Sequence, residues 1–246
     1  MRPDLRTPAF HLLTGTLVAA AVLLPVLMVW YPKPLLEASG TARLPLFVAV
    51  LAVVLGPLTA HVAARRSPAN GARLRWKIGA AQAAVLLGCL FALYVQRPVY
   101  LVFTVDRFDL VRAVEIDPRD LAKAAREEYQ HRPLGAPQYV AAVPPADPVE
   151  VQRILGIALD GGKDLQAYPQ HYVPYEQQAQ AALKRAKPVD ILLARDDGAV
   201  SRLLEKAGRA PASVRFLPLR ARKRDCVVLL DAASGMPLAV LAVDPW

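Results

Sequence analysis

Three long apolar stretches in the first 97 residues constrain this chain of 246 residues more than any other feature. They are residues 10–30, 44–62 and 78–95, and none of them contains Lys, Arg, Asp or Glu. About 20 mostly apolar residues in a helix suffice to cross the hydrocarbon core of a bilayer. Because short basic or proline-rich connections separate the three stretches, the sequence predicts three membrane-spanning helices rather than buried core helices.

The positive charge of the chain is concentrated in the same segment. Residues 1–97 carry ten basic and two acidic side chains, whereas residues 98–246 are nearly balanced, and the whole chain has a net charge of +9. This distribution excludes a uniformly basic nucleic-acid-binding protein, and no nucleic-acid partner is expected. Basic residues in short loops favour the cytoplasmic side of a membrane. Seven of the ten lie before the first stretch or between the second and third, so we expect a cytoplasmic N-terminus.

The first stretch also resembles a secretory signal peptide in having a basic start. Its apolar region is longer than the usual ~7–15 residues, and no small-residue cleavage site follows it. Residues 30–32 (Trp-Tyr-Pro) instead suggest an anchor at the membrane interface. We therefore expect the stretch to be retained. An odd number of spans then places residues 98–246 in the periplasm of a Gram-negative cell.

Small and polar residues within the stretches suggest contacts between helices. Glycine and alanine at four-residue spacing let helix backbones approach closely, and an amide in an apolar helix favours a polar partner. A Gly-Pro pair kinks a helix and exposes a carbonyl group. The candidate contact residues in this segment are Gly56, Pro57, Gly79, Gln82, Ala83 and Gly88.

Residues 98–246 have the size and charge balance of one globular domain. We assign residues 1–97 to a membrane domain and residues 98–246 to an exported domain of mixed α+β structure. Turn, cap and apolar patterns predict its elements. Expected strands are 99–105, 139–143, 214–219, 225–231 and 238–243; expected helices are 117 to just before 133, 147–159, 174–186 and 198–207, and residues 188–194 are ambiguous between strand and helix.

No catalytic or metal-binding constellation is evident, and no cofactor is expected. Cys89 lies in the third apolar stretch and Cys226 starts a predicted strand, so a disulfide between them is not expected. The apolar neighbours of Cys226 indicate a core cysteine rather than a nucleophile. His131 and His171 lack the spacing of metal ligands.

Several short motifs allow two interpretations each. Residues 160–164 (Asp-Gly-Gly-Lys-Asp) weakly resemble a phosphate-binding loop, but a helix stop is favoured. Residues 196–198 suggest either a metal corner or a helix cap. The basic run 220–224, which includes Arg222 and Arg224, is either a solvated turn or a contact for an acidic partner or anionic lipid. Asp106, Arg107 and Phe108 form either an ion-paired corner or a contact surface.

The order of several short segments resembles a known family. Three apolar stretches, a basic connection and a C-terminal domain occur in the same order in the type IV pilin accessory proteins (the TfpX/TfpZ family) of Gram-negative inner membranes. The segments that carry the resemblance are Trp30-Tyr31-Pro32, residues 53–59, residues 97–103, Asp106-Arg107-Phe108 and Asp244-Pro245-Trp246.

The resemblance implies a non-enzymatic, chaperone-like accessory protein in the inner membrane. Its expected partners are a cognate type IV major pilin and the lipid bilayer. The small-residue helix faces would pack against the apolar helix of the pilin, and the exported domain would contact the pilin head. Two alternatives remain: a membrane-anchored periplasmic ligand-binding or sensor module, and an exported enzyme that uses a pair such as Asp196 and His171.

Overall fold

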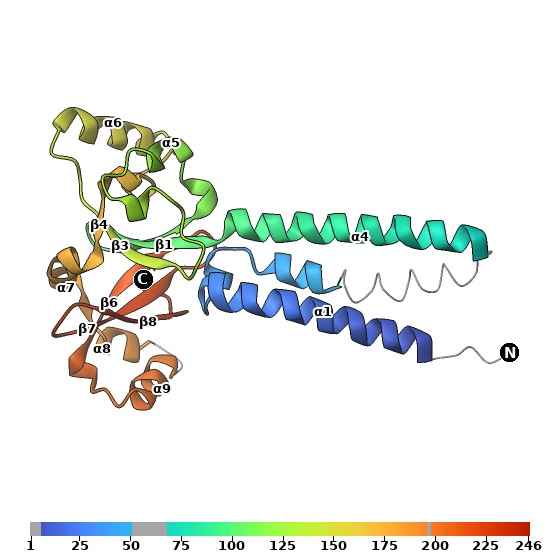
Figure 1. Cartoon of the computed structure of the whole chain (residues 1–246). Helices are drawn as coiled ribbons and strands as arrows, with labels where there is room; N and C mark the ends of the chain where they lie inside the picture. Colours follow the sequence, from blue (N-terminus) through green and yellow to red (C-terminus); the bar gives the residue numbers. More distant parts are fainter. Residues whose placement is uncertain (1–5, 51–67, 196–197) are drawn as a thin grey trace. The chain divides into compact units, whose positions relative to one another are not determined.

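The computed structural model describes residues 6–50, 68–195 and 198–246 (Figure 1). The chain divides into two compact units. Unit 1 comprises residues 1–29 and 41–96, and unit 2 comprises residues 30–40 and 97–246. A short segment from the N-terminal part of the chain, residues 30–40, therefore belongs to unit 2.

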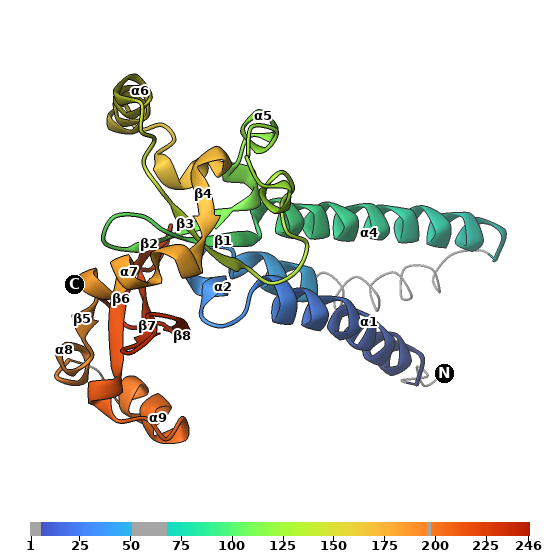
Figure 2. The ribbon, with the colours of Figure 1, turned by 60° about the vertical axis from the view of Figure 1, so that its left-hand side comes forward.

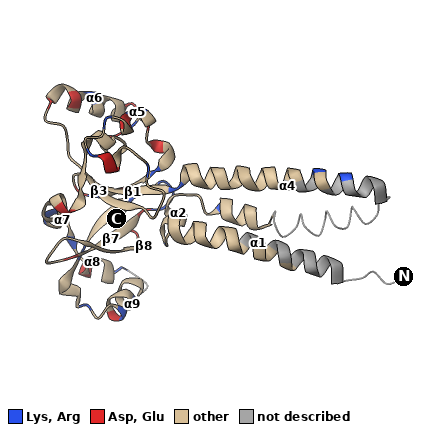
Figure 3. Cartoon of the chain, in the orientation of Figure 1, with Lys and Arg blue, Asp and Glu red and all other residues tan. Residues whose placement is uncertain are grey.

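Unit 1 contains two long helices, α1 (Arg6–Trp30) and α4 (Pro68–Gln96). Most of their described residues are uncharged, and Figure 3 shows Lys and Arg toward the start of α4. Many large apolar side chains of this unit are exposed, among them Met28, Trp76, Leu87 and Phe91. Exposed apolar surface of this kind is typical of an interaction region.

No helix in the described part of the chain is both long and apolar enough to cross a membrane. The prediction of three spanning helices is therefore wrong. The integral-membrane fold class, the inner-membrane location, the cytoplasmic N-terminus and the periplasmic C-terminal domain were derived from it and are corrected with it. An uncharged run predicts that a helix has apolar neighbours, but it does not specify what those neighbours are.

The helix bounds also differ from the predicted spans. In α4, Arg73, Arg75 and Lys77 lie inside the helix, whereas the prediction placed them in a connecting loop. The second apolar stretch lies outside the described residues from residue 51 onward.

Unit 2 is organised around an eight-stranded mixed sheet. Seven strands follow the order β4-β3-β1-β2-β6-β7-β8, and β5 also pairs with β6. Two neighbouring pairs are parallel, β1 with β3 and β2 with β6, and the others are antiparallel. The strands are β1 (Pro98–Phe103), β2 (Phe108–Arg112), β3 (Gln138–Ala142), β4 (Tyr172–Pro174), β5 (Lys187–Pro188), β6 (Val214–Arg220), β7 (Cys226–Asp231) and β8 (Pro237–Leu241).

The central strands are buried on both faces, as their continuous apolar runs predict. Along β1, Leu101 and Phe103 pack in one core cluster, and Tyr100 and Val102 pack in another. This alternation follows from the two-residue repeat of a strand. The same prediction is wrong for β8, which pairs with β7 alone in the sheet order and is half-exposed along most of its length.

The helices of unit 2 lie mainly toward the two ends of the sheet. Helices α5 and α6 lie near β3 and β4, and α8 and α9 lie near β7 and β8 (Figures 1 and 2). The α-helices are α5 (Pro118–Leu121), α6 (Pro148–Leu159), α7 (Ala179–Arg185), α8 (Asp190–Leu193) and α9 (Ala199–Lys206). The 3-10 helices are η1 (Ala113–Glu115), η2 (Glu127–Tyr129), η3 (Leu165–Ala167), η4 (Pro169–His171), η5 (Tyr175–Gln178) and η6 (Pro211–Ser213).

Two predicted N-caps are confirmed. The carboxylate of Asp117 accepts the N–H of Arg119 at 2.9 Å, and that of Asp147 accepts the N–H of Val149 at 3.0 Å. Such bonds satisfy donors that the first helical turn leaves unpaired. Helix α5 nevertheless ends at Leu121, much earlier than predicted.

Residues 30–40 complete the core of unit 2. This segment contains the short helix α2 (Leu35–Ala38), and Leu35 and Ala38 are buried in the same cluster as Phe103, Leu219 and Cys226. The carbonyl of Ala38 accepts the N–H of Lys223 at 3.0 Å. Tyr31 is also buried, so residues 30–32 pack within protein and are not the membrane-interface anchor that was expected.

The turn between β7 and β8 is fixed by Asp231. Its Oδ1 accepts the N–H groups of Ala233 at 3.0 Å and Ser234 at 2.9 Å, and its Oδ2 lies 2.6 Å from Nη1 of Arg209. The hydrogen bonds from Arg209 and Ser234 hold the pKa of this carboxyl well below its usual range. Gly235, with a φ of 75°, takes the left-handed conformation that closes the turn.

This lowered pKa predicts a pH-dependent stability. A carboxyl whose pKa is lowered by folding stabilises the native state above its unfolded pKa of about 4, and the effect is lost as the pH falls toward the folded pKa. Asp231→Asn is therefore expected to lower the urea midpoint at neutral pH, by an amount that shrinks below about pH 4. Urea titrations at several pH values measure this, with Asp106→Asn in another turn as control. A difference in urea midpoint between Asp231→Asn and the parent chain that stays constant with pH would contradict the prediction.

Candidate functional site

A cavity of about 680 Å³ lies in unit 2 where β2 extends beyond the end of β6. The pairing of these strands ends at Asp109↔Arg220, but β2 continues to Arg112. The cavity is lined by residues from within 109–115, 162–167 and 220–222, three segments far apart in the sequence. A cavity in which a few polar groups converge is the first candidate for a binding site. We call it the β2–η3 cavity.

Asp109 is the most buried charged residue of the lining, at 3% exposed. Nε of Arg220 lies 2.7 Å from its Oδ1, and Nε of Arg107 lies 3.6 Å from its Oδ2. The hydroxyl of Thr104 also lies 3.2 Å from Oδ2. Burial raises the pKa of this carboxyl, and the two guanidinium groups oppose that rise. The buried carboxylate of Asp109 is therefore compensated by the guanidinium groups of Arg220 and Arg107.

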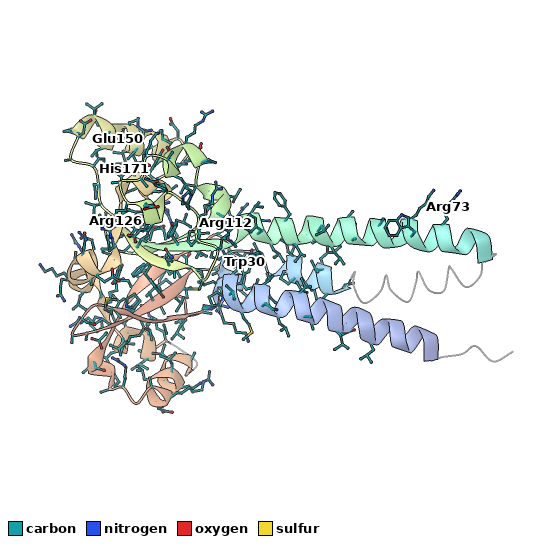
Figure 4. All side chains as sticks on the ribbon, in the orientation of Figure 1. Trp30, Arg73, Arg112, Arg126, Glu150 and His171 are labelled. Carbon is teal, nitrogen blue, oxygen red and sulfur yellow. The ribbon has the colours of Figure 1, made fainter. Side chains whose placement is uncertain are left out.

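Arg112 and Glu115 form a closed pair in one wall of the cavity. Nη2 and Nε of Arg112 donate to Oε1 of Glu115 at 2.7 and 3.1 Å, and the N–H of Arg112 donates to Oε2 at 2.7 Å. Arg112, labelled in Figure 4, is buried. Forked pairing of this kind fixes both side chains, so Arg112 supports the wall.

The mouth of the cavity carries charges that are more exposed. Nζ of Lys163 lies 3.3 Å from Oδ2 of Asp120 and 3.6 Å from Oδ2 of Asp117. Nη2 of Arg220 lies 4.0 Å from Oδ2 of Asp164, at the limit of an ion pair. Arg222 is exposed and makes no ion pair with any residue that the structure describes. Arg222 is thus the cation of the mouth that is available to a ligand.

The sequence analysis identified some of the residues that line the β2–η3 cavity but not the charged residues of β2 and η1. Residues 160–162 end α6 as expected of a helix stop: Gly161 has a φ of 80°, and the N–H of Gly162 donates to the carbonyl of Ile157 at 2.8 Å. Gly162, Lys163 and Asp164 nevertheless line the cavity. Asp109, Arg112 and Glu115 were missed; the available signal was the charged residues within the strand Phe-Asp-Leu-Val-Arg.

Asp106, Arg107 and Phe108 lie at the turn between β1 and β2. The N–H of Thr104 donates to the carbonyl of Arg107 at 3.0 Å, and Nη1 of Arg107 lies 3.5 Å from Oδ1 of Asp106. Phe108 is fully buried in the core. This geometry is that of an ion-paired corner, with Arg107 behind the floor of the cavity.

The two predicted contact residues of the basic run are separated. Arg222 lines the cavity. By contrast, Nη2 of Arg224 donates to the carbonyl of Ala242 at 3.1 Å, and Nη1 of Arg224 lies 3.9 Å from Oε2 of Glu37. Arg224 therefore lies beside segment 30–40 and the C-terminal residues.

The small-residue candidates of unit 1 are placed only in part. Ala83 and Gly88 lie exposed on α4, and a Cβ added at Gly88 would meet no atom within 4 Å. For Gly79 and Gln82 the structure describes the helix backbone alone, and Gly56 and Pro57 lie outside the described residues. Gly88 thus belongs to an open helix face.

The reactive residue types are not gathered at one place. In the part of the chain that the structure describes, no group of three or more His, Cys, Asp and Glu residues is positioned to hold a metal ion. His171 lies beside Glu150 of α6, with 3.8 Å between Nε2 and Oε1 (Figure 4). Burial lowers the pKa of His171, which favours its neutral form. Asp196, its proposed partner in an enzyme, lies outside the described residues.

Cys226 is a core cysteine, as predicted. It is fully buried, it is a free thiol, and burial raises its pKa to about 11. Because the thiolate is the reactive form, we expect Cys226 in the folded chain to resist an aromatic disulfide reagent at neutral pH and to react once the chain is unfolded in urea. Mass spectrometry of labelled peptides measures this. Rapid labelling of Cys226 without urea would show that its strand is accessible.

Helix α6 exposes an apolar face. Val151, Leu155 and Leu159 recur every four residues on the solvent side, and Leu159 is 78% exposed. The opposite side meets the rest of unit 2 through buried Ile154 and through Arg153, whose guanidinium lies 5.4 Å from the ring centroid of Tyr168. A contiguous exposed apolar face is typical of a protein interaction site.

Comparisons with known proteins found no family model that matches this chain. No solved structure matches it either. Two curated proteins of Dichelobacter nodosus are similar to it: "Fimbrial assembly protein, serogroup I" and "Fimbrial assembly protein, serogroup E1". Each is 26% identical over 243 residues, which cover 94% of this chain and 91% of the relative. The similarity therefore includes both units.

Proposed function

We propose that this chain takes part in fimbrial assembly as a chaperone-like accessory protein that binds the fimbrial subunit, a type IV major pilin, and is not an enzyme. The observation that carries the proposal is the similarity to two fimbrial assembly proteins over nearly the full length of both chains. The resemblance seen in the sequence, to type IV pilin accessory proteins, supports the same class of function.

Two features of the structure support binding as the mode of action. Unit 1 exposes large apolar side chains along α1 and α4, and α6 of unit 2 exposes an apolar face. Such surfaces offer contacts to an apolar helix and to the folded part of a subunit, respectively.

Deletion of the gene in the organism that encodes this chain tests the proposal. Cells are expected to lose most surface fimbriae and to recover them when the intact gene is restored. Electron microscopy measures fimbriae, and immunoblotting of the subunit separates loss of subunit stability from loss of assembly. Unchanged fimbriation and an unchanged subunit level would contradict the proposal.

The β2–η3 cavity favours a second candidate, a module that binds a small ligand. Under this alternative, a small molecule would raise the thermal midpoint of the purified chain, and deletion of the gene would leave fimbriation intact.

A further inference from the structure

At the mouth of the β2–η3 cavity, Lys163 and Arg220 are already in ion pairs, whereas Arg222 makes none with a described residue. Lys163, Arg220 and Arg222 all reach it, and Arg222 is exposed without an ion pair to any described residue. The buried carboxylate of Asp109 is already held by Arg220 and Arg107. The exposed guanidinium of Arg222 favours an anionic group on the ligand.

The carboxylates at the mouth restrict which anion fits. The side chains of Asp164 and Glu115 are 40% and 38% exposed. Glu115 is compensated by Arg112, whereas the carboxylate of Asp164 would repel a multiply charged group such as phosphate more strongly than a single carboxylate, because like charges at close range are unfavourable. A single carboxylate next to uncharged groups avoids most of that repulsion and still pairs with the guanidinium of Arg222.

The rest of the lining suits a peptide. Val111, Ala167 and Val114 supply apolar contacts, and Val114 is 57% exposed at the edge of the cavity. An extended chain advances by ~3.3–3.6 Å per residue, so a cavity of about 680 Å³ can hold a short peptide segment. The lining thus suits a carboxylate beside an apolar side chain, which is the chemistry of an acidic peptide.

We propose that the β2–η3 cavity binds an acidic segment of the fimbrial subunit, with a carboxylate of that segment paired to Arg222 and a neighbouring apolar side chain against Val114. The inference rests on the proposed function, because it names the surface and the chemistry by which this chain holds the subunit. The carboxylate of Asp164 repels the carboxylate of the bound segment and thereby lowers the affinity of the cavity for it.

Three variants of the full chain test the proposal in a binding assay with the purified fimbrial subunit. Arg222→Glu is expected to weaken binding roughly tenfold or more, because it replaces an attraction by a repulsion at the rim. Asp164→Asn is expected to strengthen binding about two- to fivefold, because it removes a repelling charge. Arg202→Glu makes the same charge change at an exposed position of α9 and is expected to bind as the parent does. Thermal midpoints establish that all three variants are folded.

The outcomes separate the site from the function. If the parent chain does not bind the subunit, the proposed function fails. If the parent binds and Arg222→Glu binds equally well, the function stands and the cavity is not the site. Overlapping peptides from the subunit provide a second test: those that bind in an Arg222-dependent way are expected to contain Asp or Glu beside an apolar residue. Thermal stabilisation by inorganic phosphate alone, lost in Arg222→Glu, would instead make this a phosphate site and overturn the proposal.

Discussion

Replacing Leu35 by aspartate is expected to destabilise unit 2 by about 4 kcal/mol or more. Leu35 lies in segment 30–40, which is far in sequence from the rest of unit 2. It is nevertheless 2% exposed and belongs to the core cluster of Phe103, Leu219 and Cys226. The substitution removes these apolar contacts and buries a carboxylate among aliphatic and aromatic side chains. Losses of this size are a large share of the 5–15 kcal/mol by which domains are typically stable.

Urea denaturation of the full chain, followed by circular dichroism of the sheet, measures this effect. Lys33→Asp places the same new residue at an exposed position of the same segment and serves as the matched control. Equal midpoints for the two variants would show that segment 30–40 does not belong to the core of unit 2. The expected difference would establish that residues 97–246 need this segment for full stability.

The parts of unit 2 that were predicted correctly depend on local signals. Asp117 and Asp147 each precede a proline and cap a helix, and the prediction rested on that pair of residues alone. The strands β1, β3, β6 and β7 are short apolar runs that the sequence marks without reference to distant residues. The two final strands, expected at 225–231 and 238–243, were likewise predicted from their own apolar runs.

The missed elements depend on neighbours far away in the sequence. Strand β2 carries Asp109 and Arg112 in a run of five residues, so its apolar pattern is weak. The charge of Asp109 becomes compatible with a buried strand because Arg220, more than 100 residues further along the chain, pairs with it, and Arg112 pairs locally with Glu115. Such tertiary pairing overrides local propensity. The β2–η3 cavity was missed for the same reason, since its three segments lie far apart in the sequence and meet only in the folded chain.

The membrane prediction failed because composition does not specify surroundings. An uncharged helix is expected wherever its neighbours are apolar. Arg97 illustrates the limit: it lies two residues after the third apolar stretch, yet it is fully buried within unit 2. Sequence position and charge alone gave no sign that a guanidinium would lie inside the protein.

Arg97→Ala is expected to destabilise unit 2 by about 3 kcal/mol or more. Nη2 of Arg97 donates to the carbonyl of Pro133 at 3.0 Å, and the guanidinium lies 5.7 Å from the ring centroid of Trp30. Nε1 of Trp30 donates to the adjacent carbonyl, that of Leu134, at 2.7 Å. The two side chains therefore hold one loop jointly, and truncation removes the partner of a half-buried carbonyl and leaves a void.

The matched control is Arg119→Ala, which removes the same side chain from an exposed position of α5 and is expected to shift stability by less than about 0.5 kcal/mol. Arg97→Lys should recover only part of the loss, because an ammonium group cannot both reach the Pro133 carbonyl and lie flat over Trp30. Trp30→Phe should reduce the cost of Arg97→Ala, because the two residues contact the same loop and each other. Additive losses in that double-mutant cycle would show that Arg97 and Trp30 act independently, and the loop would then not be held by their joint contact.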